Sequence, residues 1–250
     1  MRLNITASSR LGLVRKNNED MVLVGDWFIR NGKMSAHEDT WAVDRFLLAV
    51  ADGMGGHNSG EVASSDVLHN LQFFFSDLPV GLSISDFNET IYEWLTSINN
   101  IIDSKGQNEE RFSGMGTTLV SLAYYGGEFF WMNCGDSRIY RLRDSEFLQL
   151  SVDDLERVPE GVRRKAGLTQ FLGVPPDELE MEPHIVKCEL KHGDTFLICS
   201  DGLTDMLSNL DICVILRQHI SIKKCAQHLV EQALKNGGRD NTTVIVIRVD

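Results

Sequence analysis

The stretch VADGMGGHNSGEVAS, residues 50–64, ends an apolar run with a carboxylate and then removes most of its side chains. Asp52 stands where the strand-like segment 45–53 gives way to a turn, and the glycines that follow are Gly53, Gly55, Gly56 and Gly60. On its own, an Asp-Gly pair is a common surface turn. The alternative is that a charged ligand reaches the backbone here, because glycine leaves room for a close approach.

The same pattern of an apolar run, a small residue and an aspartate recurs along the chain. It occurs at Asp52 in LLAVADG, Asp136 in FWMNCGDS, Asp201 in FLICSDG and Asp240 in GGRDN. If these strand ends meet in one cleft, the carboxylates repel one another unless a cation holds them. Ligands that are all oxygens favour Mg²⁺, Mn²⁺ or Ca²⁺ over Zn²⁺, and Mn²⁺ or Mg²⁺ suits catalysis better.

A fifth acidic position, the pair Glu19-Asp20, begins the strand-like stretch 20–29. Arg15 lies five residues before Asp20 and is the basic residue that belongs with this set. A guanidinium beside a metal cluster binds phosphate through two parallel hydrogen bonds. The alternative for Arg15 is a surface ion pair with Glu19, and the sequence leaves both open.

Periodicity predicts an α+β fold. Apolar residues at helical spacing predict helices over 60–78, 86–106, 208–219 and 221–236, the second with an Asp86/Glu89 capping box and a stop at Gly106. Strand-like stretches are 20–29, 45–53, 117–125, 128–142, 146–150, 195–202 and 241–250, and the polar segment 30–40 is expected to be a loop. Gly126-Gly127 supplies the positive φ angles of a tight hairpin. Serial hairpins with grouped helices indicate antiparallel sheets rather than βαβ units.

Composition narrows the class of protein. The 250 residues suit one domain over 1–250, and a net charge of −12 argues against a nucleic-acid or anionic-membrane partner. The five cysteines form no CxxC pair, which indicates reduced thiols, and no apolar stretch approaches the roughly 18 residues of a membrane span. We therefore expect a soluble, cytoplasmic monomer.

Other phosphate chemistries lack their motifs. The chain has no GxxxxGK[ST] loop, no G-x-S-x-G elbow and no EF-hand loop. No cysteine has an arginine six positions later, as a cysteine phosphatase requires.

Six segments together resemble the metal-dependent protein serine/threonine phosphatases of the type 2C (PPM) family. In chain order they are GLVRKNNED, VADGMGG, GMGTTLVSL, NCGDSRIYRL, LICSDGLTDML and GRDNTTVIVI. The version of the motif with methionine after Asp-Gly resembles that of the bacterial branch of the family. The resemblance implies a four-layer α/β/β/α sandwich, with two central antiparallel sheets flanked by paired helices and a binuclear Mn²⁺ or Mg²⁺ centre at one edge of the sheets.

The same resemblance implies roles for the acidic residues. Asp52 would bridge both ions, and the carbonyl of Gly53 would complete one site. Asp201 and Asp240 would bind the first ion, and Glu19 would act on the second, directly or through water.

Three further assignments come from the same motifs. Asp20 would support the cluster, and Asp136 together with Asp201 would form a third, weaker ion site. Asn241 and Thr117 would be structural or would support the ligands.

The implied reaction is direct hydrolysis of phosphoserine or phosphothreonine by a metal-bridging water, with Arg15 clamping the phosphate and no covalent phosphoenzyme. The leaving-group acid is open, because Met54 stands where the animal branch carries histidine, and His57 fits a surface position better. The expected partners are phosphorylated proteins, targets of a Ser/Thr kinase. The alternative is a pseudophosphatase that binds phosphoproteins, which the complete acidic set disfavours.

Two segments depart from the family pattern. The connection 26–44 is longer than usual and has no assigned role, and the flap at 151–178 is short. The flap's basic cluster, Arg163-Arg164-Lys165, either touches an acidic phosphopeptide or is a solvated helix face.

Overall fold

Two antiparallel sheets form the centre of the molecule. The computed structural model of the chain describes residues 1–55, 59–159, 166–176, 181–218 and 220–250. The first sheet has six strands in the order β10-β9-β12-β13-β1-β4. Their bounds are β1 (Arg2–Arg10), β4 (Gly32–Asp39), β9 (Arg138–Arg143), β10 (Glu146–Gln149), β12 (Thr195–Cys199) and β13 (Thr242–Val249).

The second sheet has seven strands, six in the order β11-β8-β7-β5-β2-β3 and β6 paired with β5. Their bounds are β2 (Asp20–Val24), β3 (Trp27–Ile29), β5 (Arg45–Met54), β6 (Gly116–Thr117), β7 (Leu119–Tyr125), β8 (Glu128–Cys134) and β11 (His184–Cys188). The pairings in both sheets are antiparallel, as the serial hairpins predict.

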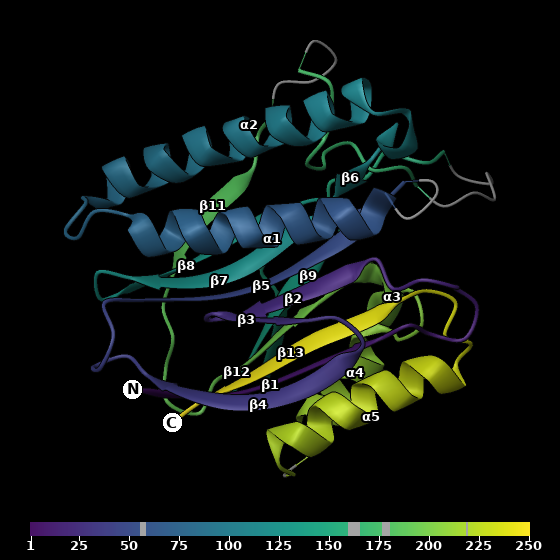
Figure 1. Cartoon of the computed structure of the whole chain (residues 1–250). Coiled ribbons are helices and arrows are strands. Elements are labelled where there is room, and N and C mark those ends of the chain that lie inside the picture. Colours follow the sequence, from purple (N-terminus) through teal and green to yellow (C-terminus); the bar gives the residue numbers. More distant parts are fainter. Residues whose placement is uncertain (56–58, 160–165, 177–180, 219) are drawn as a thin grey trace.

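Helices cover both outer faces of this pair of sheets (Figure 1). Helices α1 (Ser59–Asp77) and α2 (Ile84–Asn108) lie over the second sheet, and a short 3₁₀ turn, η1 (Glu110–Phe112), follows them. Helices α3 (Asp201–Thr204), α4 (Asn209–Leu216) and α5 (Ile222–Lys235) lie over the first. Three apolar clusters fill the three interfaces, so the predicted α+β four-layer sandwich is confirmed. In the described residues, none of the helices has the length and apolarity needed to cross a bilayer.

Helix α2 begins earlier and ends later than its pattern predicts. The cap is Ser83, whose hydroxyl accepts the Asp86 backbone N–H at 3.1 Å, so the Asp86/Glu89 capping box is wrong. Gly106 lies inside the helix, which runs to Asn108 because the packed apolar stripe outweighs one unfavourable residue. At α5 the predicted Ser221 cap is confirmed.

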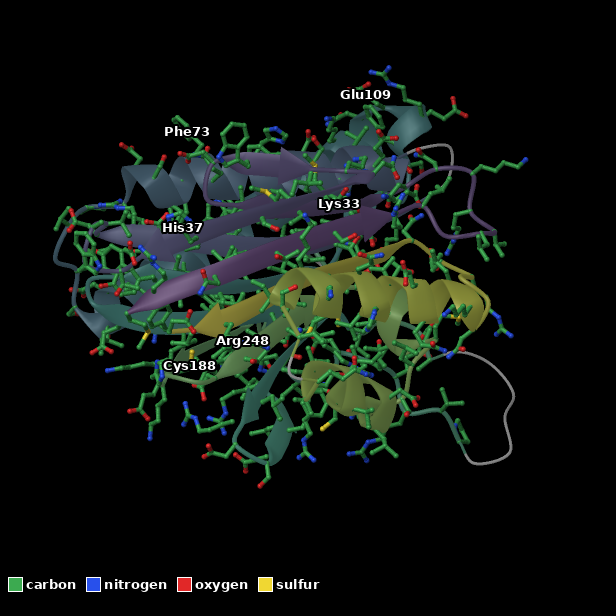
Figure 2. The ribbon with its side chains drawn as sticks, turned by 90° about the horizontal axis from the view of Figure 1, so that it is seen from below. Lys33, His37, Phe73, Glu109, Cys188 and Arg248 are labelled. Atoms are coloured by element: carbon green, nitrogen blue, oxygen red, sulfur yellow. The ribbon has the colours of Figure 1, made fainter. Side chains whose placement is uncertain are left out.

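The expected loop at 30–40 is wrong. The stretch 20–29 is a hairpin of β2 and β3 that turns at Gly25, where φ is +58°, and the chain continues into β4. Met34 and Ala36 face the interior while Lys33 and His37 are exposed, and Figure 2 shows the latter two along this edge strand. The polar residues are typical of an unpaired edge, and for this reason they resemble a loop in the sequence.

The expected single strand 128–142 is also wrong. It divides at Gly135, which has φ +107°, into β8 of the second sheet and β9 of the first. Strands β1 and β11, for which the sequence raised no expectation, complete the two sheets. The Gly126-Gly127 hairpin is confirmed, with φ values of +57° and +90°.

Gly135→Ala should lower the free energy of unfolding by about 3 kcal/mol, because it combines positive φ with overpacking. A Cβ at Gly135 would stand 2.7 Å from Thr118 Cγ2. Gly127→Ala is the control, since a Cβ there meets nothing within 4 Å, and it should cost about 1 kcal/mol. Chemical denaturation measures both, and equal losses would contradict the steric part of the explanation.

Candidate metal centre

A cleft of about 220 Å³ opens where strands of both sheets end. It is lined by seven of the eight predicted site residues: Arg15, Glu19, Asp52, Gly53, Asp136, Asp201 and Asp240. The eighth, Asp20, is not on the cleft surface and is fully buried. The remaining lining consists of Met54, Gly55, Thr118, Ala166 and Leu168.

Asp20 and Asp52 are direct neighbours across the β2–β5 pairing. The backbone N–H of Asp52 donates to Thr118 Oγ1 at 3.1 Å, and its carbonyl accepts from Thr117 Oγ1 at 2.9 Å. These bonds fix the backbone where β5 leaves the core. Gly53 is required sterically as well, because a Cβ there would lie 1.9 Å from the carbonyl oxygen of Gly60.

Asp20 joins the two sheets beneath the cleft. Its Oδ2 accepts a hydrogen bond of 2.7 Å from Ser200 Oγ, at the end of β12. Its Oδ1 is buried and has no hydrogen-bond partner within the described residues. A buried carboxylate oxygen without a donor needs compensation, and a nearby cation supplies it.

Burial raises the pKa of Asp20 to about 7, and the charges of Asp201 and Asp240 add to the rise. The pKa of Asp52 is also well above its usual range, first through burial and then through the charge of Asp20. For Glu19, burial outweighs the opposing effect of Arg15 and raises the pKa. Each shift has the same meaning: the cleft disfavours ionised carboxylates until positive charge enters.

Asp136 lies where the chain crosses from β8 to β9 and is 8% exposed. The turn is held by the flap, because the backbone N–H of Gly135 donates to Asp154 Oδ2 at 2.8 Å. On its other side, Ser137 Oγ and Thr118 Oγ1 lie 2.7 Å apart. The same threonine therefore contacts the backbone of Asp52 and the turn of Asp136.

Asp201 and Asp240 belong to two loops that pack tightly. Asp201 begins α3, and a Cβ at the following Gly202 would lie 1.8 Å from the Asn241 carbonyl oxygen. The Asn241 side chain accepts from the Glu19 backbone N–H at 2.8 Å and donates to the carbonyl of Leu11. Asn241 thus has the structural role expected of it, since it joins the Asp240 loop to the loop that carries Glu19.

Arg15 binds Asp240 rather than Glu19, with Nη2 2.5 Å from Oδ2. The pKa of Arg15 is raised first by this hydrogen bond. The other carboxylate oxygen of Asp240 accepts the Asn241 backbone N–H at 2.9 Å. The ion-pair alternative for Arg15 is therefore partly right, with a different partner.

The acids line one cleft without forming a closed cage. Across residues 1–55, 59–159, 166–176, 181–218 and 220–250, no three histidine, cysteine or acidic side chains are spaced like ligands of a single ion. Ionised carboxylates repel one another at short range and approach closely only around a cation. The donor set is all oxygen and includes an orphaned buried oxygen, which fits Mg²⁺ or Mn²⁺.

Ser200 and Thr118 support the acids and were not predicted from the sequence. Their only signal is their position next to an acidic motif, in CSDG and GTTL. Of the flap, Ala166 and Leu168 reach the cleft, and the backbone of Leu172 pairs with Thr117. Arg163, Arg164 and Lys165 lie outside the described residues, as do Gly56 and His57.

Known proteins are similar to this chain in both sequence and fold. A sequence profile of the family named "Protein phosphatase 2C" matches residues 31–236. The chain belongs to that family. The serine/threonine protein phosphatase PstP of Mycobacterium tuberculosis is 34% identical over 99% of this chain, which spans 45% of PstP. The protein phosphatase PhpP of Streptococcus pneumoniae is 30% identical over 99% of this chain and 98% of its own length.

Solved structures agree with the family assignment. The serine/threonine phosphatase of S. agalactiae has a TM-score of 0.84 at 28% identity, covering 99% of this chain and 100% of its own. The PstP catalytic domain in complex with two manganese ions has a TM-score of 0.75 at 33% identity, with both chains covered completely. The resemblance found in the sequence is therefore confirmed.

Asp20→Asn should raise the free energy of unfolding of the metal-free chain at pH 8 by about 1–2 kcal/mol. The pKa of Asp20 is higher in the folded state, so ionisation above that pKa costs stability, and asparagine removes the cost. The control is Asp194→Asn, because Asp194 is equally buried yet paired with Arg143 at 2.7 Å. That change should lower stability by about 3 kcal/mol. Denaturant titration measures the free energy of unfolding of both variants. A loss of stability in both would contradict the claim that an ionised Asp20 destabilises the metal-free fold.

Proposed function

We propose that this chain is a single catalytic domain, residues 1–250, that hydrolyses phosphoserine and phosphothreonine in proteins with the help of divalent cations. The observation that carries the proposal is the convergence of Asp52, Asp201 and Asp240, from both sheets, on one cleft above the buried Asp20. The names of the relatives agree with it, since two are called serine/threonine phosphatases and PhpP a protein phosphatase.

The acids divide the work of holding ions. Asp52, Asp201 and Asp240 would hold the first ion, and Asp52 and Glu19 would serve the second. The Gly53 carbonyl would complete one of these two sites. When bound, Mn²⁺ or Mg²⁺ supplies positive charge opposite the phosphoryl oxygens, and it lowers the pKa of a bound water to near neutral pH.

A third, weaker ion would lie at Asp136 and Asp201. Asp20 supports the cluster from below through its charge.

Arg15 would bind the phosphoryl oxygens and stabilise their charge during transfer. Its guanidinium is already at the mouth of the cleft, paired with Asp240. A cation held by Asp240 would compete with Arg15 for this carboxylate. Metal binding would therefore release Arg15 toward the phosphate, and the two events are linked.

Direct attack by water is supported by the state of the thiols. Cys134 and Cys199, each two residues from a predicted ligand, are both buried. Burial raises the pKa of both thiols, that of Cys199 to about 12. Burial also raises the pKa of Cys188 to about 12. Met54 at the cleft has no proton to give, so the leaving group takes its proton from another donor or from water.

The substrates would be phosphoproteins made by a Ser/Thr kinase, in the cytoplasm, with the chain acting as a monomer. The flap residues Ala166 and Leu168 stand at the cleft and would contact the segment around the phosphorylated residue.

Added Mn²⁺ should give hydrolysis of p-nitrophenyl phosphate and of a phosphothreonine peptide, and excess EDTA should abolish both. Asp52→Asn should lower kcat by about 100-fold or more, because it removes the bridging carboxylate. Asp26→Asn is the matched control at the far end of the second sheet, and it should keep full activity. Full turnover in EDTA would overturn the proposal, and Mn²⁺ binding without turnover would favour the pseudophosphatase.

Arg15→Ala should lower kcat/KM by about 10–100-fold and leave Mn²⁺ affinity equal or tighter, since Asp240 loses a competing partner. Arg15→Lys should recover only part of the activity, because lysine has no planar fork. Steady-state kinetics and calorimetric Mn²⁺ titration measure the two effects. Weaker Mn²⁺ binding in Arg15→Ala would contradict the competition.

A further inference from the structure

Arg30 reaches from the segment 26–44, which has no assigned role, to the loop of predicted metal ligands. It lies between β3 and β4, where the chain passes from one sheet to the other (Figure 1), and its side chain is only 15% exposed. Nη1 donates to the Asn18 carbonyl at 2.6 Å. Nη2 donates to the Glu61 carbonyl at 2.9 Å and to Ser64 Oγ at 3.0 Å, both on α1.

Ser64 extends this contact to a predicted ligand. Its hydroxyl accepts from Arg30 and donates to the Glu19 carbonyl at 2.5 Å. One guanidinium therefore holds two successive carbonyls, that of Asn18 directly and that of Glu19 through a buried serine. Peptide units fixed in this way set the directions in which the side chains of Glu19 and Asp20 leave the backbone.

The neighbouring Asn31 adds a second attachment. It adopts a left-handed conformation, φ 57°, and its Oδ1 accepts from Asn18 Nδ2 at 2.9 Å. The other end of the Asn18 amide, Oδ1, accepts the backbone N–H of Asp20 at 3.2 Å. The turn Arg30-Asn31 thus contacts the ligand loop through both the backbone and the side chain of Asn18.

We propose that Arg30 is a positioning residue that holds the Glu19-Asp20 loop against α1 in the geometry that binds the cation. This assigns a role to the 26–44 segment, and it rests on the proposed function because it presumes that these acids bind metal.

The charge of Arg30 and its hydrogen-bond geometry predict opposite effects on the affinity of the site for a cation. Its positive charge interacts with Glu19 and Asp20, so as a charge alone it competes with the cation, and its removal would tighten metal binding. As a guanidinium whose hydrogen bonds order the loop, Arg30 favours cation binding, and its removal would lower the metal affinity. The sign of the change therefore decides between the two.

The test is calorimetric titration of the purified, metal-free chain with Mn²⁺. Arg30→Met should weaken Mn²⁺ affinity about tenfold, and Arg30→Lys should remain weakened, because an ammonium cannot bridge Asn18 and α1 as the fork does. Unchanged or tighter binding in Arg30→Met would overturn the proposal. Full recovery in Arg30→Lys would overturn it as well.

Arg45→Met is the matched control for general loosening. Arg45 is an arginine that donates to the Phe75 and Ser76 carbonyls at 3.1 Å, at the opposite end of the same helix. It should lower thermal stability comparably and leave Mn²⁺ affinity within about twofold. An equal loss of affinity in Arg45→Met would overturn the specific role of Arg30.

Amide hydrogen exchange of the metal-free variants gives a readout that needs no metal. Exchange at residues 17–21 should accelerate in Arg30→Met and not in Arg45→Met. Equal exchange there would overturn the proposal even if the wild type binds Mn²⁺. A wild-type chain that bound no Mn²⁺ would overturn the metal centre itself and the role of Arg30 with it.

Discussion

Repulsion among carboxylates brought together at the strand ends is the constraint on which this structure depends. The raised pKa values of Asp20, Asp52 and Glu19 all express it, and each begins with burial. A flexible chain would relieve the repulsion by spreading its loops. This chain resists because neutral groups, the hydroxyl of Thr118 and the amide of Asn241 among them, fix the backbone beside the acids. Neutral hydrogen bonds order the loops without neutralising the charge that a cation needs.

The two-sheet sandwich holds acids from different strands at a fixed spacing. Asp52 comes from the second sheet and Asp201 and Asp240 from the ends of strands in the first, so the site exists only while the sheets keep their spacing. An apolar cluster fills the interface between the sheets, and the bond from Ser200 to Asp20 crosses it at the cleft end. Packing density in such an interior resists small shifts, which makes the core a rigid support for the acids.

The sequence indicated where these acids lie, because each stands at the beginning or the end of an apolar run and that pattern is local. It could not predict the division at Gly135, since the residues on both sides favour strand and only the tertiary arrangement sends β8 and β9 to different sheets. The role of Ser200 was likewise invisible, because its partner Asp20 lies 180 residues away. Local periodicity predicts the helices, the strands and the motifs. The residues that hold the site in place act through contacts between distant parts of the chain, which local patterns do not show.

The segment 26–44 shows the same limit and its physical reason. Edge strand β4 was hidden by the polar residues that protect an unpaired edge, and nothing in the local sequence marks Arg30 as a donor to the carbonyl of Asn18. The position of Arg30 also affects the net charge of the proposed metal site. The six acids Glu19, Asp20, Asp52, Asp136, Asp201 and Asp240, with Arg15 and Arg30, leave four negative charges when all are ionised. Two divalent ions neutralise four charges, and a third would find an already neutral cluster. For the proposed set of ligands, that balance predicts weaker binding of a third ion than of the first two.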